Sequence, residues 1–181
     1  MPGPDPYLAA PADLALLLDE PADSPRLLLA LRLASSRFRG AVRHPVSLVT
    51  GDTVVLDGSG RATLHLPAAP IVAVHHVRID GEVVTGVRVR HVSGVLLHPS
   101  GVWDMWSSIE VTYDHGHAVV PDDVAEAVLD KARVVHDVLP AVQQITTGSE
   151  SVSFAAVAAV GTTDQWRAAV EAHQLNRGDR P

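Results

Sequence analysis

The spacing of apolar residues along the chain changes twice. Residues 11–40 carry leucines at helical intervals, and residues 46–113 hold short β-rich runs divided by turn residues. After Pro121 the helical interval returns. Helices, then strands, then helices again are typical of an α+β fold rather than a doubly wound α/β fold. The pattern therefore predicts a small helical bundle, a β-rich insertion at about 46–113, and a C-terminal arm or helix.

The first zone predicts two helices. In PADLALLLDEP a short helix places Leu14, Leu17 and Leu18 on one side. The segment DSPRLLLALRLASSRFRG predicts a second helix, with Pro25 in its first turn and Gly40 at its end. The buried stripe of this second helix is expected to consist of Leu27, Leu28, Leu31 and Phe38.

A third long helix is predicted after Pro121. Its apolar stripe consists of Val124, Val128, Ala132, Val135 and Leu139, and Pro140 ends or kinks it. We expect residues 11–40 and 122–147 to form the helical bundle, which together with the β-rich insertion makes up the core of the protein, residues 11–147. Six side chains should be buried together: Leu28, Leu31, Phe38, Val124, Val128 and Val135.

Seven short runs predict the strands of the insertion. They read VSLVT, TVVLD, ATLHL, IVAVHHVRID, EVVTGVRVRH, GVLLH and SIEVTY. Asp80 and Gly81 stand between two alternating runs. They predict a tight hairpin, since both central residues of a type I′ turn need positive φ.

The two ends of the chain are predicted to be appended arms. Residues 1–10 hold three prolines and suggest a flexible arm, and residues 148–181 form an arm followed by a docking helix in TTDQWRAAVEAHQL. Four residues of this helix fall at helical spacing: Trp166, Ala169, Val170 and His173. On a free monomer they would give an exposed apolar stripe that docks onto a larger partner.

Composition narrows the function classes. At 181 residues the chain suits one domain with a modest appended piece. It has no cysteine, which excludes disulfides, iron–sulfur clusters and thiolate zinc sites. The N-terminal apolar run is broken by Asp13, Asp19 and Pro21, so neither a signal peptide nor a membrane span is expected. The formal net charge of −7 opposes general binding to nucleic acid phosphates.

The segment VTYDHGHAVVPDDVAEAVLDKA, residues 111 to 132, groups the most chemistry-bearing side chains. On a strand, His115 and His117 would share a face and could bind one metal ion, as in a small metal-dependent hydrolase. Gly116 breaks such a strand, and no third ligand stands at a recognisable spacing such as HExxH. Pro121 is followed by two aspartates that suit the positive end of a helix dipole. These features favour a strand-to-helix corner.

The remaining groupings give weaker signals for catalysis or ligand binding. The chain has no GxSxG motif, and GDTVVLDGSGR lacks the Lys-Ser/Thr end of a phosphate loop. Trp103 and Trp106 could stack on a sugar or base, as in a ligand-binding β module, but such a pair more often covers a hydrophobic edge or joins a protein interface. Arg32 and Arg37 favour a solvated face, or contact with an acidic neighbouring subunit, over phosphate binding.

Three ordered segments carry a family resemblance. They are GDTVVLDGSGRATLHLPAAPIVAVHHVRIDGEVV, GVLLHPSGVW and SIEVTYDHGHAVVPDDVAEAVLDKA, followed by SESVSF. Together they resemble the head-to-tail adaptor (head-completion connector) proteins of tailed phages, chiefly those of actinobacterial phages and prophages. The matching positions are Tyr113, His115, Gly116, Val120, Pro121, Asp122 and Ala125. Asp114 and His117 depart from the family pattern, which has Thr and an aromatic residue there.

The resemblance implies a structural role without enzymatic activity or cofactors. Such adaptors form a ring of about twelve subunits between the portal and the stopper or tail. DNA passes through the ring without specific binding, and the C-terminal helix would dock onto the portal or an adjacent subunit. The resemblance also implies assembly in the bacterial host cytoplasm, final location in the neck of the virion, and no membrane association. A tailed phage, a gene transfer agent or another phage-derived particle would use the same part.

Overall fold

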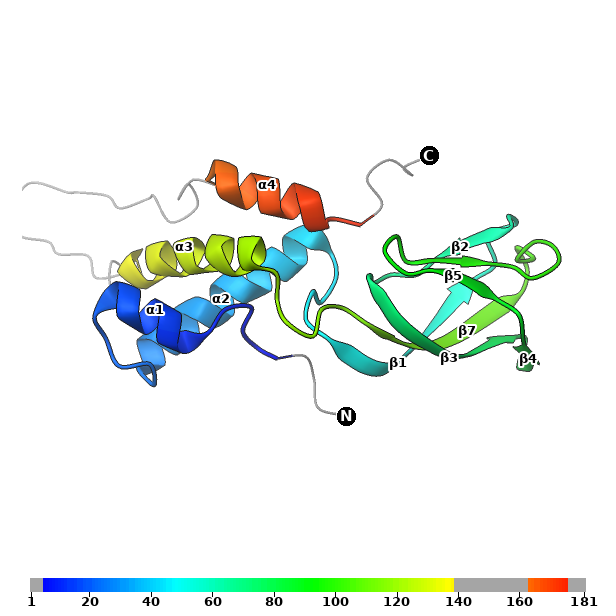
Figure 1. Ribbon diagram of the computed structural model, residues 1–181, viewed down its shortest axis with the longest axis horizontal. Helices are drawn as coiled ribbons and strands as arrows, with labels where there is room; N and C mark the ends of the chain where they lie inside the picture. The colour runs from blue at the N-terminus through cyan, green and yellow to red at the C-terminus, as the bar shows by residue number, and fades with distance from the viewer. Residues whose placement is uncertain (1–4, 139–162, 176–181) are drawn as a thin grey trace, which may run out of the picture. The chain divides into compact units, whose positions relative to one another are not determined.

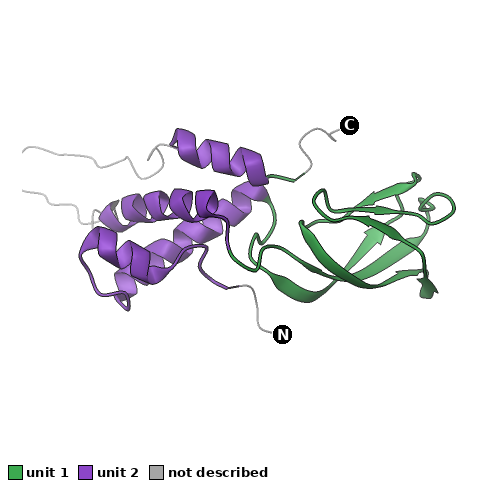
Figure 2. Ribbon diagram, viewed as in Figure 1, with its two compact units in different colours: residues 1–4, 43–119, 174–181 green, residues 5–42, 120–173 purple. Residues whose placement is uncertain are grey.

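The computed structural model describes residues 5–138 and 163–175. Within this range the chain divides into two compact units (Figure 2). Unit 1 is the β-rich segment Arg43–Val119 with short terminal segments, and unit 2 joins Asp5–Val42 to Val120–His173. Helices and antiparallel sheets in one chain confirm the predicted α+β class. The predicted positions of Leu139 and Pro140, the arm at 148–162 with its SESVSF segment, and the last residues lie outside the described ranges.

The described residues of unit 2 form four helices (Figure 1). They are α1 (Pro11–Leu18), α2 (Pro25–Val42), α3 (Asp122–Val138) and α4 (Asp164–His173). Helices α2 and α3 pack against each other, and α1 and α4 each contact both of them. The end predicted for α2 at Gly40 is wrong: the helix continues to Val42, which is fully buried, and Arg43 then takes the left-handed conformation with φ 66°. No described helix is long and apolar enough to cross a membrane.

The core of unit 2 follows the predicted stripes closely. Leu31, Phe38, Val124 and Val128 are fully buried and Val135 is 8% exposed, whereas Leu28 is half-buried. In α1 the prediction is only partly correct. Leu14 is buried, but Leu17 is 51% exposed, because Ala15 takes the second buried position of this helix. Apolar residues occupy most positions of α1, so their spacing does not single out one face.

The residues just before α1 are held against α2. Leu8 is fully buried, and its backbone N–H donates a hydrogen bond of 3.0 Å to the Ser35 hydroxyl of α2. The Arg39 guanidinium donates to the carbonyl oxygen of Pro6 at 3.1 Å. This part of the segment expected to be a flexible arm is therefore packed against the helical unit.

Two antiparallel sheets build unit 1. The first has the order β1-β7-β3-β4, and the second has the order β2-β6-β5. The first sheet consists of β1 (Val49–Asp57), β7 (Ser108–His115), β3 (Ile71–Ile79) and β4 (Glu82–Val84). The second consists of β2 (Thr63–His65), β6 (Val95–Leu97) and β5 (Arg88–Arg90). The predicted hairpin at Asp80 and Gly81 is confirmed, with φ values of 50° and 90° between paired β3 and β4.

The strands differ from the predicted runs at two glycines. The last two residues of VSLVT join TVVLD in the single strand β1, which crosses Gly51 with a register shift against β7. EVVTGVRVRH instead splits at Gly86, where φ is 78°. Its first part becomes β4 of one sheet and its second part β5 of the other. A glycine tolerates positive φ and can redirect the chain between sheets, which apolar alternation alone does not reveal.

Strand β7 supplies the centre of the unit 1 core. Its residues Ile109, Val111 and Tyr113 alternate inward and are fully buried, and they cluster with Trp103 and Leu96. The backbone around Trp103 is tied to the β1–β2 connection, because its N–H donates to Arg61 O at 2.8 Å. This central strand carries the residues 113–116 toward the corner that the sequence singled out.

Candidate partner-binding surface

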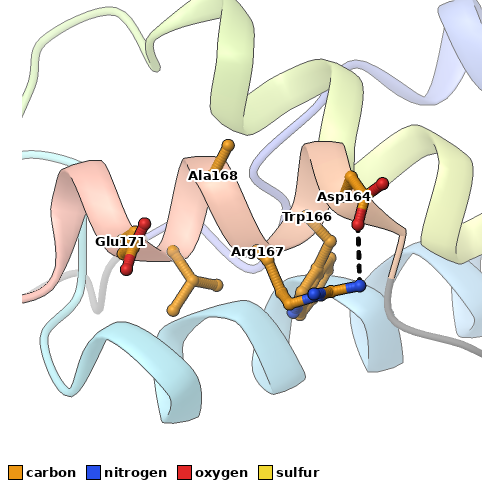
Figure 3. Close-up of a pocket in the computed structure, with 6 residues that line it drawn as sticks. Asp164, Trp166, Arg167, Ala168 and Glu171 are labelled. Atoms are coloured by element: carbon orange, nitrogen blue, oxygen red, sulfur yellow. Dashed lines mark hydrogen bonds and ion pairs between the residues drawn. The ribbon is translucent and has the colours of Figure 1, made fainter.

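Helix α4 is positioned by a local cap and an ion pair. Trp166 N–H donates to the Thr163 hydroxyl at 3.1 Å, which satisfies a free donor of the first turn. Arg167 pairs with Asp164 at 2.7 Å (Figure 3). An open groove of about 500 Å³ runs along the helix and is lined by Asp164, Trp166, Arg167, Ala168, Val170 and Glu171.

The apolar stripe of α4 is not exposed as expected. Trp166 is 8% exposed and Ala169 3%. The Trp166 ring meets Phe38 of α2 edge to face, with centroids 5.2 Å apart, and Lys131 Nζ of α3 lies 5.8 Å from the ring centroid. The expectation of exposure is wrong because α2 and α3 of the same chain present enough apolar surface to hold a large aromatic side chain.

The remaining predicted residues are half-buried or exposed. Val170 and His173 are half-buried, and His173 Nε2 lies 2.9 Å from Asp123 Oδ2 of α3. Arg32 and Arg37 of α2 are exposed. That any of these six residues, Trp166 and Ala169 included, contacts a partner stays a prediction.

Positive charge gathers beside Trp166. Burial lowers the pKa of Lys131, and the nearby Arg37 guanidinium lowers it further. Lys131 is thus close both to the aromatic ring and to Arg37. Sequence reasoning missed Lys131. The available signal was its position between Val128 and Ala132, two residues of the apolar stripe, and its being the single lysine of the chain.

The corner after β7 is confirmed as a strand-to-helix connection. The strand ends at His115, and α3 begins at Asp122. His115 is 1% exposed and its Nε2 lies 3.0 Å from Asp52 Oδ2, whereas His117 lies beyond the strand and its N–H donates to Val46 O at 2.8 Å. Gly116 separates them with φ 92°. Over the described ranges no three His, Asp or Glu side chains are grouped so as to hold a metal ion.

Gly116 is the residue of this corner that is most constrained. A Cβ added there would lie 2.3 Å from the carbonyl oxygen of Ser47, and φ is positive. We expect Gly116→Ala to destabilise unit 1 by about 2 kcal/mol or more in urea unfolding. Gly81→Ala is the matched control, because it has a similar φ of 90° and nothing within 4 Å of the added Cβ. Equal losses in both variants would show that φ alone, not the contact with Ser47, causes the effect.

Asp114 makes unit 1 sensitive to acid. The Gly51 N–H donates to its carboxylate at 2.6 Å, and His75 Nε2 lies 2.8 Å away. The hydrogen bond from Gly51, and then the one from His75, lower the pKa of Asp114 below its ordinary value of 3.8. The contribution of this carboxylate to stability is therefore present above its ordinary pKa of 3.8 and is lost as the pH falls through the lowered pKa. We expect the stability difference between wild type and Asp114→Asn in urea unfolding to shrink as the pH falls below about 5 and to vanish once the pH is below the lowered pKa.

The two tryptophans considered for ligand stacking lie in different environments. Trp103 is fully buried and meets the His98 ring edge to face at 5.0 Å. Trp106 is 90% exposed. Because one ring belongs to the core of unit 1, the two cannot clamp a sugar or base together.

Solved structures give the decisive comparison, since no protein-family model and no curated protein matches the chain. A chain in the neck of a native gene transfer agent (GTA) particle, computed with C12 symmetry, is 18% identical with a TM-score of 0.61, covering 100% of this chain and 97% of that one. A chain in the neck of an empty GTA particle, computed with C6 symmetry, is 19% identical with the same TM-score and coverage. The chain has the fold of a GTA neck protein.

A third similar chain comes from the virion of a native GTA particle. It is 18% identical with a TM-score of 0.63, and the match covers 98% of this chain and 95% of that one. The fold thus agrees with the resemblance that the sequence indicated, since all three similar chains belong to gene transfer agent particles and two of them to the neck.

Proposed function

We propose that this protein is a structural head-to-tail adaptor of a tailed phage or phage-like particle. Its copies form a ring between the portal and the stopper or tail, and the ring continues the DNA channel. The observation that carries the proposal is a match of the entire fold, covering 97% of chains from GTA necks. A match limited to one helix pair or to one sheet would cover only part of one unit, whereas this match covers both units.

The symmetry of those necks, which were computed with C12 and C6 symmetry, supports the proposed ring. Identical subunits close into a ring when one surface of each subunit binds a different surface of the next. A ring of about twelve subunits is the proposed assembly. It would form in the bacterial host cytoplasm and become part of the virion neck.

The charge of the chain suits a DNA conduit. A formal net charge of −7 offers few cations to phosphate, so DNA could slide through the channel without being held. No base-specific contact is needed for this role. The portal and the stopper or tail-completion protein are the proposed neighbours on the two sides of the ring.

The proposed role requires neither catalysis nor a cofactor. We expect purified protein to contain far less than one zinc, nickel or manganese ion per chain by elemental analysis. The double variant His115→Gln with His117→Gln is the control. A stoichiometric metal that the double variant loses would favour the metal-dependent hydrolase over the adaptor.

Deletion of the gene tests the adaptor role directly. In a cell that produces the particle, its loss should yield DNA-filled heads that carry no tails, as seen by electron microscopy of purified particles. Wild-type protein supplied from a plasmid should restore tailed particles. Normal tailed particles in the absence of the protein would overturn the proposal.

A further inference from the structure

The outer face of α2, opposite its buried stripe, carries a strip of two half-buried leucines and two exposed small residues. Leu29, Leu33, Ser36 and Gly40 recur at helical spacing on the side away from the buried stripe. Leu29 and Leu33 are half-buried, and Ser36 and Gly40 are exposed. A Cβ added at Gly40 would meet no atom within 4 Å. Small residues at the end of the strip would let another helix approach closely.

Arginines border this strip. Helix α2 contains four arginines and no acidic residue. Arg26 donates to His136 O at 2.7 Å, and Arg39 donates to Pro6 O. Arg32 and Arg37 are exposed on opposite flanks of the strip, and within the described ranges neither forms an ion pair. The face is therefore suited to an acidic helix.

Helix α3 presents the complementary face. It carries five acidic residues and two basic ones. Asp122, Glu126 and Asp130 follow one another at intervals of four residues, on the side opposite the buried Val124 and Val128. None of the three acidic residues forms an ion pair in the part of the chain that the structure describes. Like charges at this spacing destabilise a helix. Arg133, which is exposed on the same side, offsets part of this repulsion, and positive charge from another molecule would offset the rest.

The two faces point in opposite directions. The inner sides of α2 and α3 pack on each other, which turns the outer sides away from each other. Helices of 18 and 17 residues extend about 27 and 26 Å, so the faces match in length. A subunit with two different complementary faces on opposite sides associates head to tail rather than as a closed two-fold dimer.

We propose that the outer face of α2 binds the acidic outer face of α3 in a second copy of this chain, with Arg32 and Arg37 opposite Glu126 and Asp130. The proposal rests on the adaptor function and names the contact that closes its ring. Leu29 and Leu33 supply the apolar centre, and the charged pairs select the partner and its register. DNA is a poorer occupant of this face, because the chain as a whole is acidic.

Charge exchange between the two faces tests the proposal. Variant A is Arg32→Glu with Arg37→Glu, and variant B is Glu126→Arg with Asp130→Arg. In each variant alone, like charges meet at every contact. We expect the concentration at which rings form to rise by more than about tenfold, by sedimentation velocity and electron microscopy. In an equimolar mixture, the acidic α2 of A meets the basic α3 of B. The unchanged basic α2 of B likewise meets the unchanged acidic α3 of A, so rings in which A and B alternate should form.

Two controls accompany the exchange. Arg88→Glu with Arg90→Glu changes the charge of exposed residues in β5 by the same amount and should leave ring formation unchanged. The neutral pair Arg32→Gln with Arg37→Gln should give a smaller loss, and it keeps the test decisive if a reversal unfolds the protein. Circular dichroism establishes that each variant is folded.

Three results would overturn this interface. In the first, the wild type stays monomeric at all concentrations. In the second, A or B alone forms rings at the wild-type concentration. In the third, the mixture stays dissociated although both variants are folded. The gene deletion separates this failure from failure of the adaptor role. Heads without tails, together with rings of A or B at the wild-type concentration, would reject only the proposed contact.

Discussion

Replacing Val128 with aspartate is expected to unfold the helical unit. Val128 lies in α3 with no exposed surface, in the core that α3 shares with α2. An aspartate there would bury a carboxylate without a partner, at a cost of more than about 3 kcal/mol. Since domains are stable by only about 5–15 kcal/mol, the loss should lower the urea midpoint strongly. Circular dichroism in the helical band during urea unfolding measures it.

Val119→Asp is the control for this substitution. Val119 is 82% exposed, so the same chemical change should alter the free energy of unfolding by less than about 0.5 kcal/mol. If Val128→Asp unfolded at the same urea concentration as Val119→Asp, the assignment of Val128 to the buried side of α3 would be wrong.

Replacing Trp166 with alanine is expected to detach α4 from the helical unit. Trp166 is 8% exposed, packs on Phe38 and lies beneath Lys131 Nζ. Truncation of such a side chain leaves a large cavity and typically costs about 3–5 kcal/mol. This loss affects the free chain and precedes any loss of partner binding. Urea unfolding measures the loss of stability, and amide hydrogen exchange of α4 measures its detachment.

Trp106→Ala serves as the matched control, because Trp106 is 90% exposed. We expect it to leave the free energy of unfolding within about 0.5 kcal/mol of the wild type. Unchanged stability and unchanged protection of α4 in Trp166→Ala would contradict the packing of α4. Such a result would favour the earlier prediction, from its helical spacing, that Trp166 is exposed and docks onto a partner.

The sequence pattern was sufficient to identify the buried residues of long helices that have one buried face. The stripes of α2 and α3 identified Leu31, Phe38, Val124 and Val128, all of which are fully buried. An 18-residue helix repeats its apolar interval several times, so one exceptional residue does not hide which side is buried. Short α1 offers barely two repeats, and its face was predicted with one error, at Leu17.

The candidate surface was less predictable because exposure depends on what the rest of the chain covers. The spacing of Trp166 and Ala169 indicated an apolar stripe and an interaction, but not its partner. The partner is α2 and α3 of the same chain, through Phe38 and Lys131. Those contacts join residues more than a hundred positions apart, or on separate helices, and no local pattern encodes them.

By itself, the sequence determined the α+β class, the order of helices and strands, the Asp80–Gly81 hairpin and the corner at Gly116. These features depend on apolar periodicity and on local backbone preferences, which act over a few residues. Only the tertiary structure decided that the end of VSLVT continues into TVVLD as one strand, that β4 and β5 belong to different sheets, and that Trp166 is covered. It also decided that the basic face of α2 and the acidic face of α3 point apart. Each of these depends on which distant surfaces meet, and that is set by the packing of the entire chain.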